Sequence, residues 1–234
     1  MQLISILPAD KIVLIKAARS IALLVRLHIK KKREQMRKII IIQLLVTILL
    51  LSCKKDNEEP LCMDFKLEQS TLNNELDYEI MNSVLETYFI NSDFIHIVQK
   101  TKSPVHSEFI KDKLVSENIV FDSLLLSDYS EKNSNAYFLS SNNFELNTVR
   151  LINPTETNCF FSVEYKGWEN YYKKYPKSTG LHTFSRPGIN TTGNQAIIEY
   201  GWQANYDTGM GYLVVLEKVN NKWIVKNRIP TWAS

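Results

Sequence analysis

A short apolar segment with basic residues before it and a cysteine after it constrains this chain more than any other feature. Residues 39–51 are apolar apart from two positions, Arg37 and Lys38 precede them, and Ser52 and Cys53 follow. A basic start, an apolar centre of this length and a small residue near the end are the parts of a secretory signal. The sequence therefore predicts a signal peptide over residues 36–53.

Two other structures fit this segment less well. A transmembrane helix needs about 20 apolar residues, more than residues 39–51 supply. A helix buried in a core would not run directly into the charged residues 54–60, which are typical of a solvated tether. We therefore predict a tether over residues 54–66 and a single folded domain over residues 67–234.

The end of the segment, Leu50-Leu51-Ser52-Cys53, resembles the lipobox of bacterial lipoproteins, although Leu51 replaces the commoner Ala or Ser. In that family the peptide is cut before the cysteine, whose thiol is then diacylated. The resemblance implies that Cys53 is a lipidation site and that a membrane is a partner of the chain. Two or more acyl chains anchor a protein stably, since each buried CH₂ contributes about 0.8 kcal/mol.

Residues 1–35, which precede the signal, have two explanations. Met36 alone begins an ordinary signal, so residues 1–35 are predicted to be an over-extended start. The alternative is a basic amphipathic helix whose charged residues, such as Lys16, Arg19 and Arg26, face anionic lipid.

The net charge changes sign when these N-terminal segments are set aside. The whole chain has 28 basic and 25 acidic residues, a net charge of +3. Residues 1–35 hold eight basic and two acidic residues, and residues 36–53 hold two basic residues and no acidic one. Residues 54–234 therefore carry 18 basic and 23 acidic residues, a net charge of −5. This removes the main compositional argument for nucleic-acid binding.

With Cys53 assigned to lipid, two cysteines remain, Cys62 and Cys159. In an oxidising envelope these two can form a disulfide. The alternative is two independent thiols, with Cys159 buried beside Phe160. No CxxC motif or metal-ligand spacing occurs, so we expect neither a metal nor another cofactor.

Apolar spacing predicts the elements of the domain. Residues 73–89 have apolar side chains three and four positions apart, which indicates an amphipathic helix. Alternation in the last third of the chain indicates an antiparallel meander. The other predicted helices span residues 105–115, 121–132 and 168–175, and the predicted strands span residues 94–100, 136–140, 144–152, 160–165, 181–186, 195–203, 211–219 and 223–227.

Together these elements predict an α+β domain. We expect a curved antiparallel sheet packed against the helix at residues 73–89 and its neighbours. The architecture that we expect is a cystatin-like or NTF2-like cone.

The C-terminal region also resembles a known group, the uncharacterised lipoproteins of Bacteroidota. The resemblance covers the signal and residues 168–234 and implies no established activity. In that group an acidic run after the cysteine is similar to a surface-export signal. The residues that carry the resemblance are Trp168, Tyr171, Tyr172, Tyr175, Pro176, Gly180, Phe184, Ser185, Arg186, Pro187, Gly188, Ile189, Asn190, Gln195, Ala196, Gly209, Met210, Gly211, Tyr212, Asn221, Lys222, Trp223, Trp232, Ala233 and Ser234.

An aromatic cluster and one arginine are the candidate binding residues. Trp168 and Tyr172 lie in a run with Tyr171 and Tyr175, and such rings stack on sugars or fill a groove. The same spacing is equally typical of a core stripe on a helix. Arg186 stands at the end of a predicted strand, where it binds a ligand, pairs with a carboxylate or caps a loop.

No catalytic constellation is evident. His182 and Ser185 lie an odd number of residues apart on a strand, so their side chains point to opposite faces. His96 shares its face with apolar neighbours and is predicted to be a core histidine. His106 is followed by Ser107 and Glu108, which do not converge on a metal, and the Asp207-Thr208-Gly209 triplet is predicted to be a turn.

These features favour a non-enzymatic module held at the outer membrane of a bacterial envelope, facing the periplasm or the surface. Its expected partner is a protein, a peptide or a glycan. One alternative is a lipid-anchored hydrolase whose site is assembled from His182, Arg186 and Glu199. The other is an immunity-type or inhibitor-type module.

Overall fold

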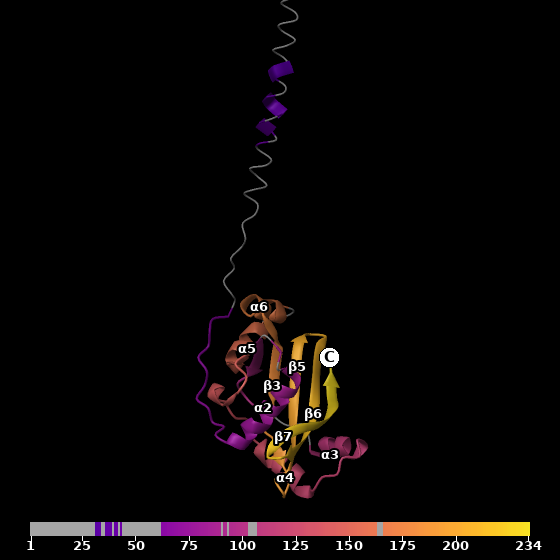
Figure 1. Ribbon diagram of the computed structural model, residues 1–234. Helices are drawn as coiled ribbons and strands as arrows, with labels where there is room; N and C mark the ends of the chain where they lie inside the picture. Colours follow the sequence, from indigo (N-terminus) through magenta and orange to yellow (C-terminus); the bar gives the residue numbers. More distant parts are fainter. Residues whose placement is uncertain are drawn as a thin grey trace, which may run out of the picture. The chain divides into compact units, whose positions relative to one another are not determined.

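The computed structural model describes residues 31–33, 36–38, 40–41, 43, 62–89, 91–92, 94–102, 107–162 and 166–234. The chain divides into two compact units, residues 1–57 and residues 58–234 (Figure 1). The described residues of the first unit are helical. Cys53 and most of the predicted tether lie outside the described residues. Within the described part of the chain, no helix is long and apolar enough to span a bilayer.

The second unit is built on one sheet. The strands lie in the order β2-β1-β3-β5-β6-β7, and the short strand β4 also pairs with β5. The strands are β1 (Phe94–Val98), β2 (Val149–Ile152), β3 (Ser178–Phe184), β4 (Gly188–Ile189), β5 (Gln195–Asn205), β6 (Thr208–Val219) and β7 (Lys222–Ala233).

The predicted α+β class is confirmed, and the sheet that packs against the helices is mixed. Strands β3, β5, β6 and β7 form the expected antiparallel meander. Strand β1 instead pairs in parallel with both β2 and β3. Parallel neighbours need long crossover connections, and the segments between these strands carry helices that serve this purpose. The finer likeness to a cystatin-like or NTF2-like cone stays a prediction.

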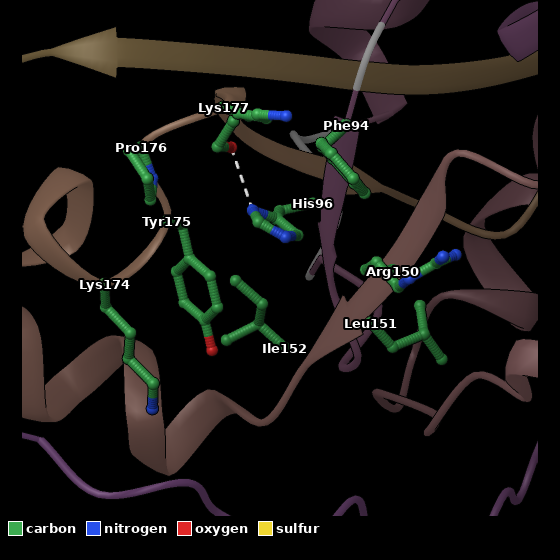
Figure 2. Close-up of a pocket in the computed structure, with 10 residues that line it drawn as sticks. Phe94, His96, Arg150, Leu151, Ile152, Lys174, Tyr175, Pro176 and Lys177 are labelled. Atoms are coloured by element: carbon green, nitrogen blue, oxygen red, sulfur yellow. Dashed lines mark hydrogen bonds between the residues drawn. The ribbon is translucent and has the colours of Figure 1, made fainter.

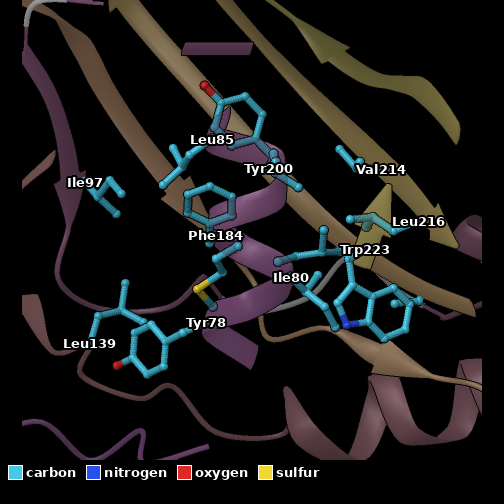
Figure 3. Packing of buried hydrophobic residues seen from close by; sticks show 14 of the residues in the cluster. Tyr78, Ile80, Leu85, Ile97, Leu139, Phe184, Tyr200, Val214, Leu216 and Trp223 are labelled. Carbon is cyan, nitrogen blue, oxygen red and sulfur yellow. The ribbon is translucent and has the colours of Figure 1, made fainter. Parts of the chain in front are cut away.

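One face of the sheet is covered by helix α2 (Glu75–Phe89). The Asn74 side chain caps the start of the helix, because its oxygen accepts a hydrogen bond from the Leu76 amide at 3.1 Å. The apolar stripe of α2 includes Ile80 and Leu85, which pack on the sheet beside Phe184 (Figure 3). The sequence-predicted helix at residues 73–89 therefore forms the main core with this face.

Four helices lie over the opposite face in two pairs. Helices α3 (Ser107–Ser116) and α4 (Ser123–Lys132) bury Ile197 and Leu213 of the sheet. Helices α5 (Pro154–Phe161) and α6 (Gly167–Lys174) form a separate aromatic cluster. The two helix pairs thus form two separate clusters on this face. The cavity described below lies at the edge of the sheet formed by β1 and β2.

The predicted strand at residues 160–165 is wrong in its first two residues, because Phe160 and Phe161 belong to helix α5. Asn153 caps this helix by accepting a hydrogen bond from the Thr155 amide at 2.7 Å, and Pro154 occupies the first helical turn. Residues 163–165 lie outside the described residues. Two other predicted strands are also shorter: residues 136–140 form only an isolated bridge at Phe138, and residues 144–152 pair only from Val149 onward.

Cys62 and Cys159 form a disulfide, with their Cα atoms 6.0 Å apart. Residues 62–66 fall in the predicted tether; in the structure Phe65 is half-buried, whereas Met63, Asp64 and Lys66 are exposed. Cys62 is buried, and the Asn153 side chain donates a hydrogen bond to the Lys66 carbonyl oxygen at 2.7 Å. The disulfide holds Cys62 against α5, to which Cys159 belongs.

Candidate functional site

A cavity of about 460 Å³ lies over β1, β2 and the segment that joins α6 to β3 (Figure 2). This volume falls in the range of small-molecule sites, roughly 300–1,000 Å³. The cavity is lined by Phe94, His96, Arg150, Leu151, Ile152, Lys174, Tyr175, Pro176, Lys177 and Ser178.

Parallel pairing brings these distant residues together. His96 of β1 lies opposite Arg150 of β2, and Phe94 lies opposite Ser178 of β3. Side chains at paired positions point to the same face of a sheet. Helix α6 ends at Lys174, and Pro176 follows, so the chain turns across this face before it enters β3.

His96 forms the back of the cavity. Its Nδ1 atom lies 2.8 Å from both the Tyr171 hydroxyl and the Ser178 hydroxyl, and these two hydroxyls also contact each other. Burial lowers the pKa of His96 to about 4, an effect that Glu156 opposes and Arg150 reinforces. The imidazole is therefore neutral at pH 7. Its Nε2 atom has no hydrogen-bond partner among the described residues.

Glu156 fixes one wall of the cavity from behind. The Tyr175 hydroxyl donates a hydrogen bond to Glu156 Oε1 at 2.5 Å, and Lys174 Nζ lies 2.6 Å from the same oxygen. Lys174 also contacts Asp64 at 2.7 Å and donates to the Met63 carbonyl oxygen at 3.0 Å. Burial, together with the bond to Glu156, raises the pKa of Tyr175. The Tyr175 ring is held in one position, and the charge of Lys174 is already paired.

Arg150 and Lys177 supply the unpaired positive charge. Among the described residues, neither has a carboxylate within ion-pair distance. None of the ten lining residues is acidic, whereas three are cationic. The cavity is therefore positive although residues 54–234 have a net charge of −5.

The predicted aromatic cluster is divided between core and cavity. Trp168 is 5% exposed and packs against Tyr171 and Phe161. The Tyr172 hydroxyl donates a hydrogen bond to the Ala204 carbonyl oxygen at 3.0 Å. Only Tyr175 of this run lines the cavity, so Trp168 and Tyr172 act in packing.

Arg186 lies on the other side of the sheet, against α2. Its Nε donates a hydrogen bond to Asp77 Oδ2 at 2.7 Å, and its guanidinium lies 4.5 Å from the Tyr137 ring centre. Burial raises the pKa of the Asp77 carboxyl despite this partner. The sequence left three roles open for Arg186: binding a ligand, pairing with a carboxylate or capping a loop. In the structure, Arg186 pairs with a carboxylate.

The three residues suggested for a dispersed hydrolase site do not converge. His182 is fully buried on the α2 face, where Nδ1 lies 2.6 Å from the Tyr200 hydroxyl and burial lowers its pKa to about 3. Glu199 points to the opposite face, where its Oε1 accepts a hydrogen bond from the Tyr129 hydroxyl at 2.9 Å. A strand alternates its faces at each residue, so Glu199 and its neighbour Tyr200 lie on different sides.

The sequence offered little sign of the cavity. Its lining comes from β1, β2 and the α6–β3 connection, which are brought together by parallel pairing that the sequence did not predict. Lys174 and Lys177 on either side of Tyr175-Pro176 are the one local pattern that could have pointed to it. His96 was predicted to be a core histidine, and it is buried, but it also lines the cavity.

The fold and this cavity define an α+β domain with a ligand-sized, positively charged cavity. In the described part of the chain, no three His, Cys, Asp or Glu side chains are grouped as metal ligands would be. Comparison with protein-family models, curated proteins and solved structures found no match for this chain.

Proposed function

We propose that this chain is a lipid-anchored protein of the bacterial cell envelope whose folded domain binds a ligand without transforming it. The observation that carries the binding function is the cavity of about 460 Å³ beside His96. Its walls are held in place before any ligand arrives, since Tyr175 bonds to Glu156 and His96 bonds to two hydroxyls. Rigid walls favour binding because little order has to be gained on association.

The anchor rests on the sequence. The basic, apolar and Ser-Cys parts of residues 36–53 support lipidation at Cys53, with the outer membrane as the site of attachment. The pairing of Cys62 with Cys159 supports this assignment indirectly, because it leaves Cys53 as the one cysteine in the sequence outside the disulfide. It is also consistent with an oxidising compartment.

The anchor is tested with Cys53→Ala expressed in a bacterium that makes lipoproteins. We expect the variant to lose labelling by a palmitate analogue and to leave the membrane fraction. The matched control is Cys62→Ala with Cys159→Ala, which removes the disulfide and should keep the label. Labelling of Cys53→Ala at the level of the natural chain would refute the anchor.

Ester hydrolysis is a second candidate function, because Ser178 Oγ lies 2.8 Å from His96 Nδ1 inside the cavity. A nucleophile needs a base at such a distance, but an efficient base has a pKa near the working pH. His96 has a pKa of about 4, and no carboxylate orients its Nε2 atom among the described residues. We therefore expect wild type and Ser178→Ala to hydrolyse 2-naphthyl acetate equally slowly, and a loss of rate in Ser178→Ala would favour the hydrolase.

A further inference from the structure

We propose that the cavity over β1 and β2 binds an anionic amphiphile, meaning a phosphate or carboxylate joined to an apolar group. The anionic group binds at Arg150 and Lys177, and the apolar group lies between Phe94 and Tyr175. This inference rests on the proposed binding function and names the chemical class of its ligand.

Arg150 is positioned as an anion ligand. Its Nη1 donates hydrogen bonds to the carbonyl oxygens of Asn147 and Val149, both at 2.7 Å, which hold the guanidinium beside β2. The guanidinium carbon of Arg150 lies 5.9 Å from the centre of the Phe94 ring. A guanidinium has five N–H groups in a fixed fork, so donors remain for a bidentate contact with phosphate or carboxylate.

Lys177 and His96 complete the polar side of the cavity. Lys177 is exposed and stands directly before β3, at the rim. Which nitrogen of the neutral His96 ring carries the proton depends on the tautomer, because both hydroxyls beside Nδ1 also lie within hydrogen-bond distance of the Gly180 carbonyl oxygen. Two cations suit an anionic group better than a neutral sugar or a cation.

No acidic side chain in the lining opposes an anion. The buried carboxylate of Glu156 is bonded to two lining residues, Lys174 and Tyr175. Its negative charge is therefore offset by Lys174, and it does not repel a ligand as an unpaired carboxylate would.

The other side of the cavity is apolar. In Figure 2, Tyr175 and Ile152 lie on one side of His96 and Phe94 lies on the other. Leu151 and Pro176 extend this surface. A ligand that carried only an anionic group would leave these side chains in water, so the ligand should have an apolar part as well.

The cavity lies beside the first described residues of the folded unit. Lys174 lines the cavity and also donates hydrogen bonds to the carbonyl oxygens of Cys62 and Met63. If Cys53 is lipidated, the ligand can come either from the membrane, as an anionic lipid, or from solution.

The test is calorimetric titration of the full chain carrying Cys53→Ala, in a non-ionic detergent, with 2-naphthyl phosphate as the probe. Protein-free micelles serve as the blank. We expect saturable binding at least about 10-fold tighter than that of 2-naphthol or inorganic phosphate, which are the two halves of the probe. Equal affinity for 2-naphthol would overturn the proposal, because the anion would then contribute nothing.

Substitutions locate the site. Arg150→Met with Lys177→Met should weaken binding by about 10-fold to 100-fold, since two charge-assisted contacts are lost. The matched control, Lys222→Met with Lys226→Met, removes the same charge from β7 at the far edge of the sheet and should bind as the parent does. Unchanged affinity in the Arg150 and Lys177 variant would refute the site.

A final arm separates the two sources of the ligand. Phosphatidylglycerol added to the micelles should displace the probe if the natural ligand is a membrane lipid, and phosphatidylcholine should not. Displacement by octyl phosphate but by neither lipid would support a ligand taken from solution. Displacement by all three alike would contradict anion recognition. Because the parent protein lacks Cys53, the result does not depend on whether that residue is lipidated.

Discussion

Two buried histidines on opposite faces of the sheet should make the stability of this domain sensitive to mild acid. Burial lowers the pKa of His96 to about 4 and that of His182 to about 3. An unfolded chain takes up protons at these residues near pH 6.5, whereas the folded chain does not. The stabilisation is therefore complete above pH 6.5 and is lost as the pH falls toward 4.

We expect the free energy of unfolding to fall by about 3 kcal/mol between pH 7 and pH 5, a window above the range in which most carboxylates titrate. Urea unfolding at several pH values measures this slope. His182→Phe should roughly halve the slope, whatever it does to stability at pH 7. The same slope in wild type and variant would show that His182 is not buried in its neutral form.

The pair formed by Arg186 and Asp77 gives a second prediction at this scale. Asp77 is fully buried, and among the described residues its Oδ1 has no hydrogen-bond partner. Arg186→Met would leave a buried carboxylate without a counter-charge and should cost about 3–5 kcal/mol in the free energy of unfolding at pH 7. Adding Asp77→Asn to this variant should recover much of the loss.

Chemical denaturation of the two variants measures both effects. The matched control is Lys226→Met, which removes one partner of an exposed pair with Glu217 and should change stability little. If Arg186→Met were as mild as this control, the pair would contribute nothing to the fold.

At the level of elements, the pairing of β6 with β7 brings a glycine of one strand close to an indole ring of the other. A Cβ atom at Gly211 would lie 1.8 Å from Trp232 Nε1, so the indole lies directly over this glycine. Gly211→Ala should displace Trp232 and cost about 1–3 kcal/mol in the free energy of unfolding.

A double-mutant cycle with Trp232→Ala tests this contact. Gly211→Ala should cost less in the Trp232→Ala background, because the clash is gone. Equal costs in the two backgrounds would show that Gly211 acts through its backbone and not through the indole.

The elements that the sequence predicted correctly have strong periodicity. Helix α2 and strands β5 and β6 show long, regular apolar patterns, and their positions are confirmed. Residues 160–165 were ambiguous, because a short apolar run fits a strand or a helix equally well. The Asn153-Pro154 start of α5 is a helix-start pattern, and it favours the helix.

The site was less predictable than the fold. Arg150 and Lys177 look like ordinary surface residues in the sequence, and they line one cavity because β1 pairs with β2 on one side and with β3 on the other. Pairing between strands so far apart in the chain is set by tertiary packing, which local periodicity does not report. The candidates chosen from the sequence, Trp168 and Tyr172, were conspicuous because they are large, and size mainly reflects packing.

At the scale of the whole molecule, the disulfide joins the start of the folded unit to helix α5. It links residues 97 positions apart, a loop for which crosslinking stabilises by about 2–5 kcal/mol. We expect Cys62→Ala with Cys159→Ala to lower the free energy of unfolding by that amount and to release the segment around Met63 from Lys174.

Guanidinium unfolding with and without reductant measures this change. The matched control is Cys53→Ala, which should unfold as the natural chain does under both conditions. A disulfide variant as stable as the oxidised parent would mean that the disulfide adds nothing to the stability of the fold.

The most direct test of a ligand-binding function is a crystal structure of the Cys53→Ala chain with 2-naphthyl phosphate. We predict the phosphate within hydrogen-bond distance of Arg150 and Lys177, and the naphthyl ring between Phe94 and Tyr175. A cavity without the ligand at saturating concentration, or a ligand seated elsewhere on the domain, would contradict the account.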